Sequence, residues 1–188
     1  PEAGVHLALT SGPAAVGPDG QPASWLGQNQ MGFDFTGLDP RRCQFDRAAI
    51  GLMNPHRHEM ALLDRIVWTS DDFTRAVAAW NVRPDEFWVR GHFPKKALVP
   101  GVLQIEAGAQ LAAFVYNKRE PQPRLCAFTR IDHCSFRAQV QPGDELIILC
   151  REIKRRSRQF ISAIQGWVNG KMAYEAEIEG LRIGESIE

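Results

Sequence analysis

The sequence predicts an α+β domain in which about six antiparallel strands surround one central helix. Two observations indicate this arrangement. From Val102 to Val115 the chain is apolar on nearly every side and rich in alanine, as expected of a thin helix buried against a sheet. The flanking segments show the alternation and turn residues of strands, and Asn169-Gly170 is a strong hairpin signal. The 188 residues, 44% hydrophobic and 23% charged, suit a single folded domain without an internal repeat.

Residues 1–44 are predicted to form an N-terminal arm and residues 45–188 the folded domain. The arm is rich in proline and glycine and shows little hydrophobic periodicity. We expect it to wrap around a partner subunit, and the alternative is order imposed only by packing between molecules. Its predicted anchors are the apolar residues Trp25, Leu26, Met31, Phe33 and Phe35.

Within the domain, the first expected element is a short helix near residues 45–53, with Asp46 as its N-terminal cap. The central helix is expected over Gly101–Asn117, because proline is tolerated in a first helical turn and polar residues follow Asn117. Strands are predicted at residues 62–69, 73–80, 125–131, 135–140, 146–153, 160–168 and 172–181.

A histidine and a glutamate stand where each is unusual. His92 lies in a turn-like segment and Glu106 inside the apolar helix. Each alone has an ordinary explanation, since a histidine beside Phe and Pro is commonly structural and a glutamate is favoured near a helix start. Together they predict a base and an acid, with neutral His92 accepting a proton and desolvated Glu106 keeping one. The Gly101 amide at the helix start could hold a carbonyl oxygen that gains negative charge.

Composition and residue spacing give no support for several other functions. Lysine plus arginine and aspartate plus glutamate number 22 each, so the overall charge gives no indication of nucleic-acid binding. The four cysteines and five histidines show no zinc spacing, although His56 and His58 alternate, and we predict free thiols and no metal site. Neither a membrane span nor a secretory signal is evident, so we expect a cytoplasmic protein.

The sequence also resembles the (3R)-hydroxyacyl-acyl carrier protein dehydratases of the FabZ class. The order and spacing of its motifs match over roughly Phe45 to Arg182. The four matching stretches are NPHRHEMALLDRI from Asn54, GHFPKKALVPGVLQIEAGAQ from Gly91, TRIDHCSFR from Thr129 and QPGDELII from Gln141. The resemblance implies a hotdog fold, a curled antiparallel sheet around one long helix, in a homodimer or a trimer of dimers.

The resemblance further implies removal of water from a (3R)-3-hydroxyacyl thioester to give the trans-2-enoyl thioester, without cofactor or metal. The substrate carries phosphopantetheine, from an acyl carrier protein or from CoA. His92 and Glu106 fall on the family's catalytic pair, with the acid supplied by the other subunit. The Gly101 amide would bind the thioester oxygen, the Leu98 carbonyl would hold the second His92 nitrogen, and Phe93 would contact substrate.

Departures at Lys95, Lys96 and Ala97, and at His58 to Met60, indicate a divergent member of that family. Two rival functions stay open, a hotdog thioesterase and a non-catalytic acyl-thioester-binding scaffold. The basic run from Arg151 to Arg158 is either a solvated surface or a carrier-docking site. Docking would use Arg155 and Arg156, together with Lys95 and Lys96.

Overall fold

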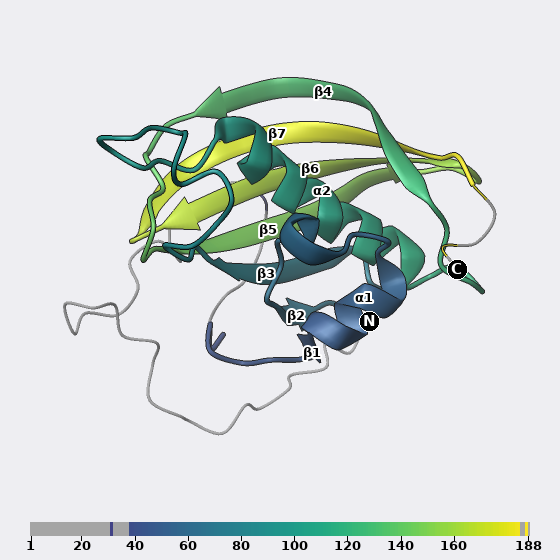
Figure 1. Ribbon diagram of the computed structural model, residues 1–188. Coiled ribbons are helices and arrows are strands. Elements are labelled where there is room, and N and C mark those ends of the chain that lie inside the picture. The colour runs from purple at the N-terminus through teal and green to yellow at the C-terminus, as the bar shows by residue number, and fades with distance from the viewer. Residues whose placement is uncertain (1–30, 32–37, 185–186, 188) are drawn as a thin grey trace, which may run out of the picture.

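The computed structural model describes residue 31, residues 38–184 and residue 187. Two α-helices, a 3₁₀ turn and a seven-stranded sheet make up this part of the chain (Figure 1). The helices are α1 (Arg47–Met53) and α2 (Gly101–Asn117), and the 3₁₀ turn is η2 (His58–Met60). The strands are β1 (Phe45–Asp46), β2 (Arg65–Thr69), β3 (Arg75–Asn81), β4 (Cys126–Phe136), β5 (Glu145–Arg155), β6 (Gln159–Val168) and β7 (Lys171–Arg182).

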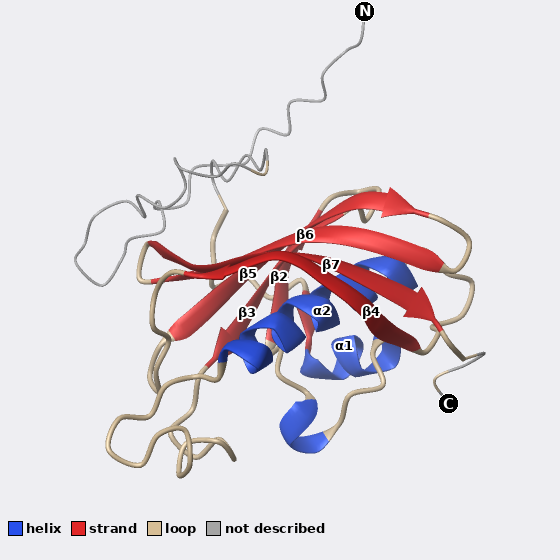
Figure 2. Cartoon of the chain, turned by 90° about the horizontal axis from the view of Figure 1, so that it is seen from above, coloured by secondary structure: helices blue, strands red, loops and turns tan. Residues whose placement is uncertain are grey.

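The sheet is antiparallel throughout and has the strand order β1-β2-β3-β5-β6-β7-β4. It curves around α2, and both helices lie on its concave side (Figure 2). The chain leaves β3, passes through α2 and returns as β4 at the far edge of the sheet. This is the arrangement expected for the hotdog fold, and the observed bounds of α2 are the predicted ones.

Helix α2 packs closely on the sheet because small residues face the strands. A Cβ atom at Gly108 would lie 2.6 Å from Cγ2 of Ile164 and 2.8 Å from the Tyr174 hydroxyl. Ile164 and Tyr174 are themselves buried, so neither can easily move aside. The close approach brings the helix residues Ala107, Leu111, Ala112 and Phe114 into the main core.

The convex face of the sheet carries a second apolar cluster. It includes Val77 of β3, Leu149 of β5 and Trp167 of β6, and Met31 is buried against them at 5% exposure. Met31 therefore anchors the arm to the sheet of its own chain. The other predicted anchors, Trp25, Leu26, Phe33 and Phe35, fall outside the described residues.

Strand β4 differs from the prediction. The two strands predicted at residues 125–131 and 135–140 are one strand, Cys126–Phe136, whose register shifts between Asp132 and Ser135 opposite β7. His133 within that bulge has a positive φ of 49°. A bulge interrupts the alternation of side chains along a strand, so one bent strand shows the sequence pattern of two. Within the described ranges, no helix is both long and apolar enough to cross a membrane.

Candidate active site

His92 lies in the loop between β3 and α2, and the backbone around it is tightly bonded. Its amide donates to the Trp88 carbonyl at 2.9 Å, and its carbonyl accepts from the Leu98 amide at 2.8 Å. Trp88 is buried and holds the loop on the core. The imidazole Nδ1 lies 2.9 Å from the Leu98 carbonyl oxygen, as predicted. A carbonyl only accepts, so neutral His92 carries its proton on Nδ1 and presents the lone pair of Nε2.

Phe93 and the two lysines follow the histidine in a tight turn. The Phe93 and Lys96 backbones exchange hydrogen bonds of 3.1 and 3.0 Å. The Phe93 ring stacks on His92 with a centroid separation of 4.1 Å and stays 52% exposed. Lys95 and Lys96 are exposed at the tip. The His92 imidazole is thus bordered by the exposed ring of Phe93 and by the positive charges of Lys95 and Lys96.

The start of α2 is open to a ligand. No side chain in the described part of the chain caps this end, and the first amides of a helix have no acceptor within the helix. A Cβ atom at Gly101 would lie 2.7 Å from the Phe136 ring, so glycine lets β4 approach the helix start. Val102 is 75% exposed beside it. Amides here can donate to a carbonyl oxygen.

Glu106 lies one turn further along α2 with its side chain 20% exposed. Its Oε1 atom is 3.1 Å from Nε2 of His56 and accepts from Nε2 of Gln110 at 2.9 Å. Burial raises the pKa of the Glu106 carboxyl, but hydrogen bonds from His56 and Gln110 and the charge of His56 outweigh burial, so its pKa is lowered. The sequence-based expectation considered desolvation alone, which raises the pKa, and took no account of these donors.

His92 and Glu106 make different contacts within one chain. Across the part of the chain that the structure describes, no hydrogen bond or ion pair joins them. Instead the base is held by its own loop, and the acid by α2 and by the loop that follows α1. The two members of the predicted catalytic pair are therefore held by separate sets of contacts.

An apolar hollow of about 250 Å³ adjoins Glu106. Helix α2 and strands β4, β6 and β7 supply its walls, so a carboxyl group lies in a largely hydrocarbon surrounding. The residues that line it are His56, Glu106, Ala109, Ala113, Cys126, Ala127, Phe128, Phe160 and Gly180.

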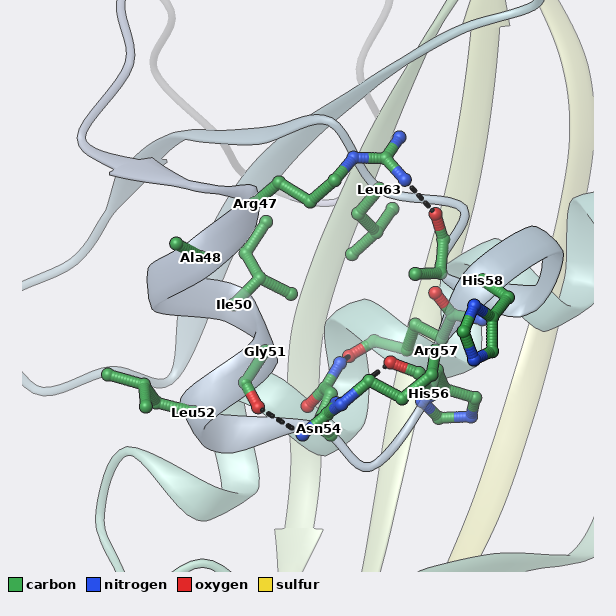
Figure 3. Close-up of a pocket in the computed structure, with 12 residues that line it drawn as sticks. Arg47, Ala48, Ile50, Gly51, Leu52, Asn54, His56, Arg57, His58 and Leu63 are labelled. Carbon is green, nitrogen blue, oxygen red and sulfur yellow. Dashed lines mark hydrogen bonds between the residues drawn. The ribbon is translucent and has the colours of Figure 1, made fainter.

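A larger hollow, of about 530 Å³, lies between α1 and the loop that follows it (Figure 3). Neither His92 nor Glu106 lines it. His56 borders both hollows, and Gln110 borders the larger one. The larger hollow is therefore not the one that the predicted catalytic residues line. His56 lines both hollows.

The basic residues predicted to dock a carrier differ in availability. The Arg155 guanidinium pairs with Glu120, donates to the Tyr116 carbonyl at 3.1 Å and lies 4.2 Å from the centroid of the Tyr116 ring. These contacts hold Arg155 in the fold. Arg156 is exposed, and its Nη1 atom donates to the Gln159 side chain at 3.3 Å. Arg156, Lys95 and Lys96 are thus the predicted docking residues with accessible charge.

Two residues at the acid were not predicted, His56 and Gln110. The alternation of His56 with His58 suggested only a metal pair facing one way, but His56 turns to Glu106 while His58 is exposed. Among the residues with described positions, no group of three or more His, Cys, Asp or Glu side chains could hold a metal ion. Two features of the sequence could have indicated these residues: Gln110 lies one helical turn after Glu106, and His56 lies in the NPHRH stretch.

The sequence pattern of the FabA-like domain matches residues 54–177. The chain belongs to this family. It is 41% identical over 120 residues to the 3-hydroxyacyl-[acyl-carrier-protein] dehydratase FabZ of Streptococcus equi subsp. zooepidemicus, which covers 63% of this chain and 84% of that protein. A FabZ from Bacillus cereus is also 41% identical, over 125 residues, 66% of this chain and 86% of that one.

Solved structures support the fold of this FabA-like domain. The dehydratase heterocomplex ApeI:P from Xenorhabdus doucetiae superposes with a TM-score of 0.61 at 15% identity, covering 72% of this chain and 91% of that one. The sigma28-regulated virulence protein Cj0977 from Campylobacter jejuni gives a TM-score of 0.55 at 18% identity, covering 75% and 89%. At such identities the likeness concerns the fold alone, and it agrees with the hotdog arrangement of the FabA-like domain.

Proposed function

We propose that this protein removes water from 3-hydroxyacyl thioesters to give 2-enoyl thioesters, as a hydro-lyase of fatty acid synthesis or a related lipid or polyketide pathway. The observation that carries the proposal is the hydrogen bond between Nδ1 of His92 and the Leu98 carbonyl. It leaves Nε2 of the neutral imidazole free to accept a proton, in a chain that is 41% identical to FabZ dehydratases.

In the proposed reaction, Nε2 of His92 removes the proton next to the thioester carbonyl. The electron pair of that C–H bond forms the new double bond as the bond to the 3-hydroxyl breaks. In the form of the site that reacts, Glu106 is protonated and donates this proton to the departing oxygen, which leaves as water. The Gly101 amide holds the thioester oxygen while it gains enolate charge. The proton on His92 then returns to Glu106 through solvent. No electrons pass to an acceptor, so the chemistry calls for no redox cofactor.

The proposed assembly is a homodimer that pairs His92 of one subunit with Glu106 of the other. Strand β4 supports this, because among the described residues it bonds only to β7 and leaves its other edge unpaired. Phe128, Ile131 and Phe136 on this strand are 39%, 46% and 52% exposed. Apolar side chains along an open edge favour pairing with a second copy, and three such dimers could form a hexamer.

The proposed substrate is an acyl chain linked through phosphopantetheine to an acyl carrier protein or to CoA. The hollow of about 250 Å³ beside Glu106 would take the chain. Lys95, Lys96 and Arg156 carry exposed positive charge that would attract an acidic carrier or its phosphate. The proposal includes neither a metal nor a nucleic acid, and it places the reaction in the cytoplasm.

One assay separates this function from its two rivals. A hydroxyacyl thioester is incubated with the protein while enoyl-thioester absorbance and free thiol are followed together. The proposal predicts enoyl signal without thiol. Thiol release would show a thioesterase, and neither signal, with binding retained, would leave a non-catalytic acyl-thioester binder.

A further inference from the structure

We propose that His56 is a positioning residue for Glu106, which it holds through Oε1 so that Oε2 is the oxygen that hands its proton to the leaving hydroxyl. The inference rests on the proposed function above and adds a residue to its acid half. Glu106 Oε1 is in contact with two nitrogen atoms, Nε2 of His56 at 3.1 Å and Nε2 of Gln110 at 2.9 Å. Oε2 has no hydrogen-bond partner among the described residues.

Hydrogen bonds hold the Gln110 side chain in place beside Glu106. Its Nε2 also donates to the Met60 carbonyl at 2.7 Å, and its Oε1 accepts from the Leu62 amide at 3.1 Å. Its backbone carbonyl accepts from the Asn54 side chain at 2.8 Å. These bonds clamp the loop from Asn54 to Leu62 onto α2 and place His56 over Glu106.

The orientation of the His56 proton follows from its surroundings. Nδ1 is buried and has no hydrogen-bond partner in the described part of the chain, whereas Nε2 faces the carboxyl. A buried N–H without an acceptor is costly, so neutral His56 carries its proton on Nε2 and donates it to Oε1. Figure 3 shows His56 on the loop after α1, beside Asn54 and Arg57.

This arrangement favours proton donation. When Glu106 gives up a proton from Oε2, a full negative charge develops on the carboxylate. Two donors already stand at Oε1, so they stabilise the developing charge without rearrangement. The same donors account for the lowered pKa of Glu106, which burial alone would raise.

Other charged groups near the pair are engaged elsewhere. On the same loop, the Arg57 guanidinium donates to the backbone carbonyls of Asn54, His56 and Gly51 at 2.8, 2.9 and 3.0 Å. On α1, Arg47 pairs with Asp64 at 2.5 Å. Neither guanidinium donates to Glu106.

The strands that line the hollow add one further titratable group among the described residues, Cys126 of β4. Burial, and then the charge of Glu120, raise the pKa of this thiol to about 11, so it stays neutral at working pH. Phe160 of β6 and Gly180 of β7 carry no charge. Within one chain, His56 is therefore the ionisable side chain that acts on Glu106.

The test compares three variants of the full-length protein. His56→Phe keeps a ring but removes the donor, His56→Gln keeps an N–H donor of similar reach, and His58→Asn changes the exposed histidine two positions away. Asparagine suits the positive φ of 53° at His58. Titration of Glu106 is followed by carboxyl ¹³C NMR, with the signal assigned from its loss in Glu106→Gln, and kcat is measured in parallel.

In His56→Phe, we expect Glu106 to titrate at higher pH, which enlarges its protonated fraction. We expect the rate per protonated Glu106, which is kcat divided by that fraction, to fall about ten- to a hundredfold, because a charge-assisted hydrogen bond is lost. His56→Gln should restore most of both properties, and His58→Asn should match the wild type. An unchanged Glu106 titration in His56→Phe would overturn the proposal, as would a moved titration with an unchanged rate per protonated Glu106. A wild-type protein without dehydratase activity would refute the proposed function instead, while the titration would still decide whether His56 holds the carboxylate.

Discussion

The carbonyl oxygen of Leu98 lies 2.9 Å from Nδ1 of His92, and this contact sets which nitrogen of the histidine can act as a base. The Leu98 amide in turn donates to the His92 carbonyl at 2.8 Å, so the two residues close a small ring. The loop between β3 and α2 therefore fixes both the tautomer and the direction of the imidazole. In a hydroxyacyl dehydratase these two properties determine whether the α-proton can be removed.

Substitution of His92 tests this base. A positioned base contributes about a hundred- to ten-thousand-fold in rate, so His92→Ala should lose dehydratase activity on that scale. The double variant with Glu106→Gln should fall much less than the product of the two single losses, because the two groups act in one step. Enoyl-thioester formation gives the rates, and circular dichroism checks the fold. Near-normal activity of His92→Ala would contradict the mechanism.

Gly108 tests the contact between helix and sheet. A Cβ atom there would meet Ile164 and Tyr174 at 2.6 and 2.8 Å, so Gly108→Ala should destabilise the protein by about 1–3 kcal/mol in urea unfolding. Gly51 of α1 is the matched control, since a Cβ atom there would meet only Arg57, at 3.9 Å. Gly51→Ala should stabilise the protein by up to about 1 kcal/mol through helix propensity. Equal effects at both glycines would refute the packing argument.

The apolar hollow beside Glu106 is expected to limit acyl-chain length. Ala109→Leu places a larger side chain in a space of about 250 Å³, so kcat/KM for long-chain substrates should fall about ten- to a hundredfold, with short-chain activity largely kept. The control Ala48→Leu makes the same change at an exposed position of α1 and should not alter the preference. A uniform loss over all chain lengths in Ala109→Leu would show that the chain binds elsewhere.

Charge reversal separates docking from structural arginines. The triple variant Lys95→Glu, Lys96→Glu and Arg156→Glu should raise KM for a carrier-bound substrate far more than for a small thioester analogue. Arg155→Glu should instead lower the melting temperature, because the replacement would face Glu120 at the broken ion pair. Equal effects of the triple variant on both substrates would remove the docking assignment.

The sequence predicted those features that depend on local chemistry. Both ends of α2 follow from Pro100, Gly101 and the apolar run that ends at Asn117. The Asp46 cap is also local, and its carboxylate accepts from the Ala49 amide at 2.8 Å. The Leu98 partner of His92 came from a resemblance over a short loop, where residues a few positions apart must come close together.

Features that depend on distant contacts were missed. His56 reaches Glu106 from a loop 50 positions earlier, so nothing local to either residue indicates the bond. The pKa of Glu106 was predicted from burial alone, whereas the larger of the opposing hydrogen bonds comes from His56, a tertiary partner. Arg155 stood in a basic run that suggested a free surface, yet its carboxylate partner Glu120 follows α2. In each case the deciding partner lies far away in the sequence.

The central claim is that His92 and Glu106 form one site across two subunits, and subunit exchange tests it most directly. His92→Ala and Glu106→Gln are each inactive in the account, and a hybrid dimer would contain one complete site and one doubly defective site. After equal amounts of the two variants exchange subunits, about a quarter of wild-type activity should return, because random pairing leaves one site in four intact. No recovery after exchange verified by mass spectrometry would contradict the account and place both groups in a site within one chain.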